Sequence, residues 1–173
     1  MKSNQFKSYL ERVNGEEGFT LIELMVVVLI IGILMAIAIP TFLGAQKSAQ
    51  DRSAQSDLRN LLTSEVSYYT QNQYYADPTD LATQDPSYAS KLGGTTPAIS
   101  VAAPSGETLS SAGATTVCLS ETSQSGTIWG IEEIATGSGA GTWYYKGTAA
   151  FSCSATPTAV AGSLSENAAT VGW

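Results

Sequence analysis

The stretch that decides the fold runs from Phe19 to Gln46 and reads FTLIELMVVVLIIGILMAIAIPTFLGAQ. From Leu24 onward this stretch carries no charged side chain. About 20 apolar residues in a helix suffice to cross a bilayer, and here Ile, Val, Leu and Met surround the predicted helix on every side. Such a helix fits lipid or the interior of a fibre better than a soluble core. We therefore expect residues 19–44 to form a transmembrane or fibre-core segment.

Residues 1–18, which precede this segment, are polar and mixed in charge. They contain no apolar stretch long enough for the hydrophobic region of a secretory signal. Basic residues flank the apolar segment on both sides, so the charge distribution does not fix its orientation in a membrane.

The helical pattern continues beyond the apolar segment to about Asn72, because residues 45–72 lack Gly and Pro and are rich in helix formers. This second half has one apolar stripe at three- and four-residue spacings, made of Ala54, Leu58, Leu61, Leu62, Val66 and Tyr69. The opposite face carries Lys47, Asp51, Arg52, Asp57, Arg59 and Glu65. We expect the stripe to pack against other elements of a globular head, residues 45–173.

The sequence of the remainder of the head predicts an antiparallel sheet. Two Asp-Pro pairs end the helix and open residues 76–114, a long loop with short local structure. Three runs rich in β-branched and aromatic residues follow, separated by turn sequences, at 115–121, 127–135 and 141–147. They predict an α+β fold in which three or four strands, within about 115–153, pack on the helix. The tail, 154–173, is either an extra edge strand or without regular structure.

Composition argues against several classes of function. The chain has 173 residues, no His and a formal net charge of -7. The absence of His removes the usual general base and the commonest metal ligand, and the negative charge argues against a nucleic-acid partner. The sequence contains no phosphate-binding loop and no Ser/His/Asp set, so we expect no enzyme, no catalytic residue, no metal and no cofactor.

Cys118 and Cys153 are the two cysteines, and neither belongs to a CxxC pair. In a domain rich in Ser and Thr, two such cysteines indicate one structural disulfide. The alternative is a pair of buried free thiols. A disulfide would place the head outside the cytoplasm.

The beginning of the apolar segment resembles the type IV pilin family, which includes the pseudopilins of type II secretion. The resemblance rests on Gly18-Phe19-Thr20-Leu21-Ile22-Glu23 followed by a long apolar helix with Gly32 and Pro40. It implies that residues 1–18 are a leader, that a prepilin peptidase cuts between Gly18 and Phe19, and that the new Phe19 amine is N-methylated. It also implies a homopolymer, extruded by an inner-membrane assembly platform and an assembly ATPase.

Glu23 is the lone acid of the apolar segment, and a carboxylate in a bilayer costs a few kcal/mol. The resemblance implies that its partner is the free Phe19 amine of a neighbouring subunit in the fibre. That amine exists only after cleavage, so cutting would make assembly electrostatically possible. The alternative is that Glu23 lies near the membrane surface and reaches water.

Gly32 and Pro40 both weaken the apolar helix, because Gly has a low helix propensity and Pro lacks the N–H that would bond Ala36. The resemblance implies that the stretch between them can unwind in the assembled fibre. A simple kink is the alternative, and the sequence does not choose between the two.

Three groups in the head have alternative interpretations. Asp77, Asp80 and Asp85 could hold calcium, but Asp before Pro favours turn and cap chemistry. Glu132 and Glu133 alternate across a predicted strand, and we expect a solvated edge there. The third group is aromatic and is expected to cover the core rather than to form an adhesion surface: Tyr68, Tyr69, Tyr74, Tyr75, Trp143, Tyr144 and Tyr145.

The sequence therefore predicts a type IV pilus subunit, inserted in the cell membrane as a single-pass precursor and then assembled into a surface filament for motility, adhesion or DNA uptake. One alternative of the same lineage is a pseudopilin of a type II secretion system or a competence pilus subunit. The alternative from another class is a membrane-anchored surface binding protein that never polymerises.

Overall fold

A computed structural model of the chain describes residues 18–92, 98–137, 139–154, 156–157, 164–165 and 171–173. The expected leader, residues 1–18, lies outside the described residues apart from Gly18, as does much of the tail. The chain divides into two compact units, with the boundary between Gly44 and Ala45. Each unit is described by itself.

The long helix α2 spans Leu21–Asn72, which confirms the helix expected from Phe19 to about Asn72. It ends because Gln73 adopts a left-handed conformation, with φ at 64°. The Gln73 N–H donates to the Tyr69 carbonyl at 2.7 Å and so satisfies one of the last carbonyls of the helix.

Among the described residues, five antiparallel strands form one sheet in the order β1-β2-β3-β4-β5, so each of these strands lies beside its neighbour in sequence. The three predicted runs appear as β2, Thr116–Thr122, β3, Ile128–Ile134, and β4, Gly141–Gly147. Two further strands raise the number above the three or four expected. They are β1, Ile99–Ala102, which lies within residues 76–114, and β5, Leu164–Ser165, in the tail.

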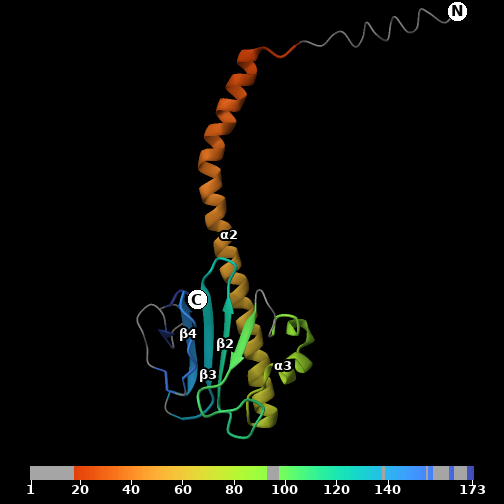
Figure 1. The fold of residues 1–173 in the computed structure, drawn as a ribbon, viewed down its shortest axis with the longest axis vertical. Helices are drawn as coiled ribbons and strands as arrows, with labels where there is room; N and C mark the ends of the chain where they lie inside the picture. The colour runs from red at the N-terminus through yellow and green to blue at the C-terminus, as the bar shows by residue number, and fades with distance from the viewer. Residues whose placement is uncertain (1–17, 93–97, 138, 155, 158–163, 166–170) are drawn as a thin grey trace, which may run out of the picture. The chain divides into compact units, whose positions relative to one another are not determined.

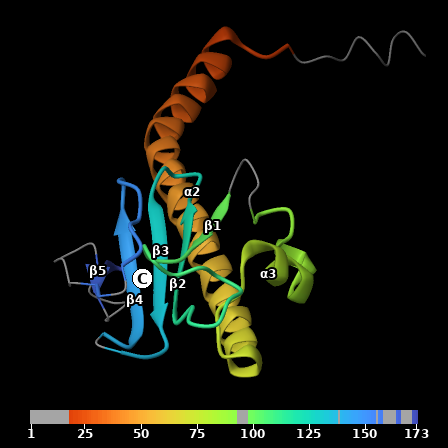
Figure 2. The same cartoon turned by 60° about the horizontal axis from the view of Figure 1, so that its bottom comes forward.

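Residues 45–72 of α2 cover one face of this sheet, as Figures 1 and 2 show. Two short helices follow α2 in the chain: α3, Pro78–Gln84, and η1, Pro86–Tyr88. The helix α2 has already ended at Asn72, before the first Asp-Pro pair, so the pairs do not end it as expected. They begin new helical turns instead, since proline suits the first position of a helix.

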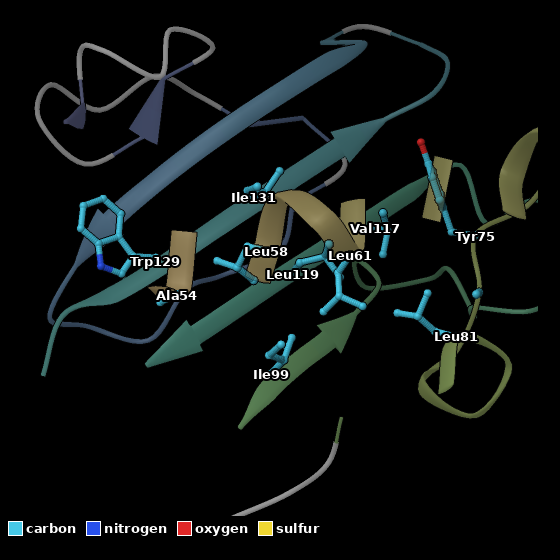
Figure 3. Packing of buried hydrophobic residues seen from close by; sticks show 11 residues of the cluster. Ala54, Leu58, Leu61, Tyr75, Leu81, Ile99, Val117, Leu119, Trp129 and Ile131 are labelled. Atoms are coloured by element: carbon cyan, nitrogen blue, oxygen red, sulfur yellow. The ribbon is translucent and has the colours of Figure 1, made fainter. Parts of the chain in front are cut away.

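The core lies between α2 and the sheet (Figure 3). Leu58 and Leu61 of α2 are fully buried. They face Val117 and Leu119 of β2 and Ile131 of β3 in the same cluster. Burying a Leu side chain contributes roughly 1.5–3 kcal/mol, so the packing of α2 on the sheet stabilises the head.

The predicted stripe is correct at Ala54, Leu58 and Leu61 and wrong at Val66, which is 40% exposed. Glu65 was expected on the polar face, but it is fully buried. The steps from Leu58 to Leu61 and from Leu61 to Glu65 keep the spacing of one helix face. The helical spacing therefore places position 65 on the core face. The assignment of Glu65 to the polar face was wrong because it followed the charge of the side chain.

The outer face of the sheet, away from α2, is covered in part by residues 151–154. Phe151 stacks on Tyr145 of β4, with ring centroids 5.0 Å apart. Its ring also lies over Gly130 of β3, where an added Cβ would come within 2.8 Å of the Phe151 ring. Glycine at this position therefore permits the segment to lie close to the strand.

Candidate assembly site

The start of α2 brings together the residues that the sequence singles out. Gly18, Phe19 and Thr20 precede the first helical turn and are exposed. Gly18 and Phe19 flank the expected cleavage position, and Glu23 lies in the first turn. The peptide bond between Gly18 and Phe19 is therefore outside the helix.

Thr20 and Glu23 form a reciprocal capping arrangement that the sequence analysis missed. The Thr20 N–H donates to Glu23 Oε2 at 2.9 Å, and the Thr20 hydroxyl donates to the same oxygen at 2.7 Å. In return, the Glu23 N–H donates to Thr20 Oγ1 at 3.3 Å. Threonine followed three residues later by glutamate is the sequence signal of a capping box, so this pairing could have been found from the sequence.

The Glu23 carboxylate lies among apolar side chains. Phe19, Ile22, Val26 and Val27 line a shallow groove with it. An acid in such surroundings is stabilised by hydrogen bonds or by an opposite charge. Thr20 supplies the hydrogen bonds within the chain, and both of them end on Oε2.

The remainder of the first unit exposes apolar surface along its length. From Phe19 to Leu43, the large hydrophobic side chains are 45% to 78% exposed. Among the described residues, α2 is the one helix long and apolar enough to cross a membrane, with a mean hydropathy of 3.0 in its most apolar window. A contiguous apolar surface of this kind marks a contact with lipid or with other protein.

Gly32 and Pro40 lie inside α2, which the structure shows as helical through both positions. Pro40 gives no N–H to the carbonyl one turn earlier. One residue on, the Thr41 hydroxyl donates to the Ile37 carbonyl at 3.1 Å. The helix is therefore present here with one backbone hydrogen bond fewer than an uninterrupted helix.

The head carries the remaining predicted residues. Cys118 and Cys153 form the expected disulfide. Asp77 caps α3 by accepting from the N–H groups of Thr79 and Asp80, and Asp85 caps η1 by accepting from the Ser87 N–H. The predicted cap chemistry is thus confirmed at both Asp-Pro pairs.

Asp80 belongs to a separate hydrogen-bonded group. Its Oδ2 accepts from the Tyr68 hydroxyl at 2.9 Å and from the Ser110 hydroxyl at 2.5 Å. These two bonds hold the pKa of Asp80 below its usual value. The three aspartates are therefore engaged with donors of their own chain.

Three glutamates of the head are buried, one on α2, one on β2 and one on β3, which the sequence did not predict. Glu132 was expected at a solvated edge and is fully buried instead. Burial raises the pKa of Glu65 to about 8 and that of Glu121 and Glu132 to about 7. Each keeps one carboxylate oxygen without a hydrogen-bond partner among the described residues, so the neutral form is favoured inside the fold.

The aromatic residues divide between core and partly exposed positions. Tyr75 and Trp143 are buried. Tyr69 stacks against Tyr75 at 4.6 Å between ring centroids. Tyr68, Tyr74, Tyr144 and Tyr145 are half-buried, so most of the cluster covers the core, as expected.

Comparison with known proteins gives an N-terminal match. Residues 13–39 match the family model of the prokaryotic N-terminal methylation motif. The type IV major pilin protein PilA of Myxococcus xanthus is 48% identical over 60 residues, which cover 35% of this chain and 27% of that protein.

Two further relatives match over similar lengths. The type II secretion system core protein G of Escherichia coli is 37% identical over 66 residues, 38% of this chain and 46% of that protein. The type IV wide pilus major component PilA4 of Thermus thermophilus is 38% identical over 63 residues, 36% of this chain and 48% of that protein. The chain thus spans between about a quarter and a half of these relatives. No solved structure matches.

Proposed function

We propose that this chain, a member of the type IV pilin and type II secretion pseudopilin family, is a structural subunit that polymerises through its N-terminal helix into a fibre. The observation that carries the proposal is the exposed apolar surface of residues 19–44 with a single carboxylate, Glu23, near its start. An apolar surface of that extent needs a partner. Lipid would cover it before assembly, and the same segment of other subunits would cover it afterwards.

Maturation would begin at the bond between Gly18 and Phe19. Both residues lie outside the helix and are exposed, which supports access by a prepilin peptidase. Cleavage would remove the polar leader and create a positively charged amine on Phe19. N-methylation of that amine would keep its charge.

Assembly would then pair the Phe19 amine of one subunit with Glu23 of another. Within the chain, both Thr20 bonds end on Oε2 of Glu23. The oxygen Oε1, which has no hydrogen bond to the described residues, would accept from the ammonium group. The local cap and the pairing between subunits are therefore compatible, and an ion pair in apolar surroundings gains strength from the low dielectric.

The stretch between Gly32 and Pro40 would unwind when subunits pack. The helix already lacks one backbone hydrogen bond at Pro40, and a glycine costs about 1 kcal/mol of helix propensity relative to alanine. Backbone groups freed by unwinding would need partners from neighbouring helices in the fibre.

The proposed route ends at the cell surface. The precursor would span the cell membrane once, and an inner-membrane platform with its assembly ATPase would extrude the fibre. The heads would form the outside of the filament and set its role in motility, adhesion or DNA uptake. The work of the chain would be polymerisation rather than catalysis.

Three variants test the pairing. Glu23→Ala removes the charge and the carboxylate half of the capping box, whereas Glu23→Gln removes the charge and keeps a side chain that can complete a capping box. Filaments are sheared from cells, and their amount is compared with the amount from the parent. Mass spectrometry then identifies the first residue of the mature protein and its methylation. We expect loss of filaments in both variants and mature protein that begins with methylated Phe19. Thr20→Val, which removes the hydroxyl half of the capping box and keeps the charge, should retain filaments.

Normal filaments from Glu23→Gln would contradict the charge pairing, and helix capping would then be the remaining role of Glu23. Mature protein that begins at a residue other than Phe19 would contradict the cleavage. A membrane-anchored protein that never polymerises would remain at the surface and working in all three variants.

A pseudopilin is the second candidate, and the similarity to type II secretion core protein G favours it. A pseudopilin would act as a short piston instead of a long filament. Deletion of the gene should then block secretion of exported proteins while sheared surface fibres remain unchanged. If the chain is a pilus subunit, deletion should leave secretion unchanged and remove the sheared surface fibres.

A further inference from the structure

The disulfide of the head lies beside a buried carboxyl group on the outer face of the sheet. Cys118 of β2 and Glu132 of β3 are directly opposite each other in the strand register. The two sulfur atoms and a carboxylate oxygen of Glu132 all lie within 4.8 Å of one another. The three side chains would suit a metal by spacing, but the sulfurs are joined to each other, so the carboxyl group faces a closed disulfide.

Glu132 is held in place at this position. Its Oε1 accepts from the Ser154 N–H at 2.9 Å, one residue after Cys153. Its Oε2 is buried and has no hydrogen-bond partner in the described part of the chain. Burial raises the pKa of Glu132 to about 7, and the Ser154 N–H opposes that rise.

Among the described residues, the side chains that these contacts place against Glu132 carry no formal charge. Cys118 lies opposite it on β2, Trp143 lies opposite it on β4, and Cys153 and Ser154 come from the covering segment. A buried carboxyl group with a free oxygen and no ion-pair partner has no evident structural gain. It is, however, a suitable group for moving a proton near neutral pH.

The two cysteines differ in exposure. Cys118 is 2% exposed, whereas Cys153 is half-buried. Attack by an external thiol is therefore assigned to the Cys153 sulfur, and the Cys118 sulfur becomes the leaving group. A thiolate left at Cys118 would be a buried charge, which is costly unless it receives a proton.

We propose that Cys118, Cys153 and Glu132 form a thiol–disulfide exchange site, in which Glu132 exchanges the proton of Cys118 and the co-reactant is an external thiol or disulfide. In the reducing direction, an external thiolate attacks the Cys153 sulfur and forms a mixed disulfide with it. The bond between the two cysteines breaks, and its electron pair passes to the Cys118 sulfur. The carboxyl proton of Glu132 moves to that sulfur, leaving a thiol and a carboxylate. A second external thiol releases Cys153.

The oxidising direction reverses these steps. An external disulfide first forms the mixed disulfide with Cys153 and releases one thiol. The Glu132 carboxylate then takes the proton of Cys118, and the resulting thiolate attacks the Cys153 sulfur. The second external thiol leaves, so that one external disulfide is reduced for each internal disulfide formed. The site thus lets the chain close its own disulfide near neutral pH.

The test starts from the native, oxidised full chain in nonionic detergent, in which Glu132 is in place. Dithiothreitol is added at pH values from 6 to 9, and thiol formation is followed by mass spectrometry after alkylation. Glu132→Gln keeps the shape and the Ser154 contact but cannot give up a proton. At each pH the parent rate is divided by the variant rate, because the ionisation of dithiothreitol affects both rates equally and drops out of this ratio. We expect a ratio of about ten or more at pH 6 that falls towards one at pH 9.

Glu133→Gln is the matched control, because Glu133 is the next residue on β3 and points to the opposite face. Its rates should equal those of the parent at every pH. A ratio for Glu132→Gln that does not change with pH would overturn the proposal. So would a ratio below one, since that is the result expected if Glu132 only holds the covering segment closed and its loss exposes the disulfide.

Discussion

Replacing Glu65 with Gln should remove a large part of the pH dependence of the head's stability. Glu65 lies on α2 between the helix and the sheet and is fully buried. Its Oε2 accepts from the Ala76 N–H at 2.9 Å, and its Oε1 has no partner among the described residues. Burial is the main cause that raises the pKa of Glu65 from 4.5 to about 8.

The sign of the change in stability with pH follows from the direction of this pKa shift. Because the folded state holds the proton more tightly than the unfolded chain, the protonated group stabilises the fold. This contribution is fully present below pH 4.5 and is lost as the pH rises through about 8. At 1.36 kcal/mol for each unit of pKa, the free energy of unfolding should fall by roughly 3 kcal/mol between pH 5 and pH 8 through Glu65 alone.

Urea unfolding of the full chain in nonionic detergent, followed by circular dichroism, measures this change. Glu121 and Glu132 act in the same direction, so the informative quantity is the difference in slope between the parent and Glu65→Gln. The variant should lose roughly 3 kcal/mol less than the parent over this range, and Glu133→Gln should follow the parent. Equal slopes for the parent and Glu65→Gln would refute the reasoning, because Glu65 would then be charged inside the fold or reached by water.

Three further substitutions have expected outcomes in the same unfolding assay. Gln73→Gly should raise the free energy of unfolding by about 0.5–1 kcal/mol, because Gln73 has a positive φ that glycine adopts without strain; a loss would mean that its side chain matters more than its backbone. Gly130→Ala should lower it by about 1–2 kcal/mol through contact with the Phe151 ring, and the loss should shrink when Phe151→Ala is also present. Trp173→Ala should lower it by about 2–3 kcal/mol, since the ring packs on Trp129 and Tyr144 and its Nε1–H donates to the Tyr145 carbonyl; an unchanged value would show that these contacts are not kept in solution.

The long helix and three strands could be predicted from the sequence because their patterns are long and regular. The helix ends at Asn72, where the pattern ends, and the three central strands coincide with the β-rich runs within one residue at each end. Strand β1 has four residues and β5 has two. Elements of that length have no periodicity to detect and depend on pairing with a neighbour that the sequence does not identify.

The buried acids could not be predicted, because residue type and position gave opposite indications. At Glu65 the helical period indicated the core, and at Glu132 the strand alternation allowed either face. Charged side chains are rarely buried without a partner, so the general rule gave the wrong answer at both positions. The cap formed by Thr20 and Glu23 was readable from their spacing, whereas the roles of Gly18 and Phe19 rest on the family resemblance.

The order of the strands has a consequence for how the head reaches its native state. Since each strand pairs with the next one in sequence, the sheet can grow by successive hairpins, with little entropy lost in closing each loop. Hairpins of this kind form within about 1–10 μs. The most distant contacts, such as Leu58 with Ile131 in the shared core, must wait until the sheet offers a surface. A newly made chain should therefore acquire its sheet quickly and dock the helix in a later, slower step.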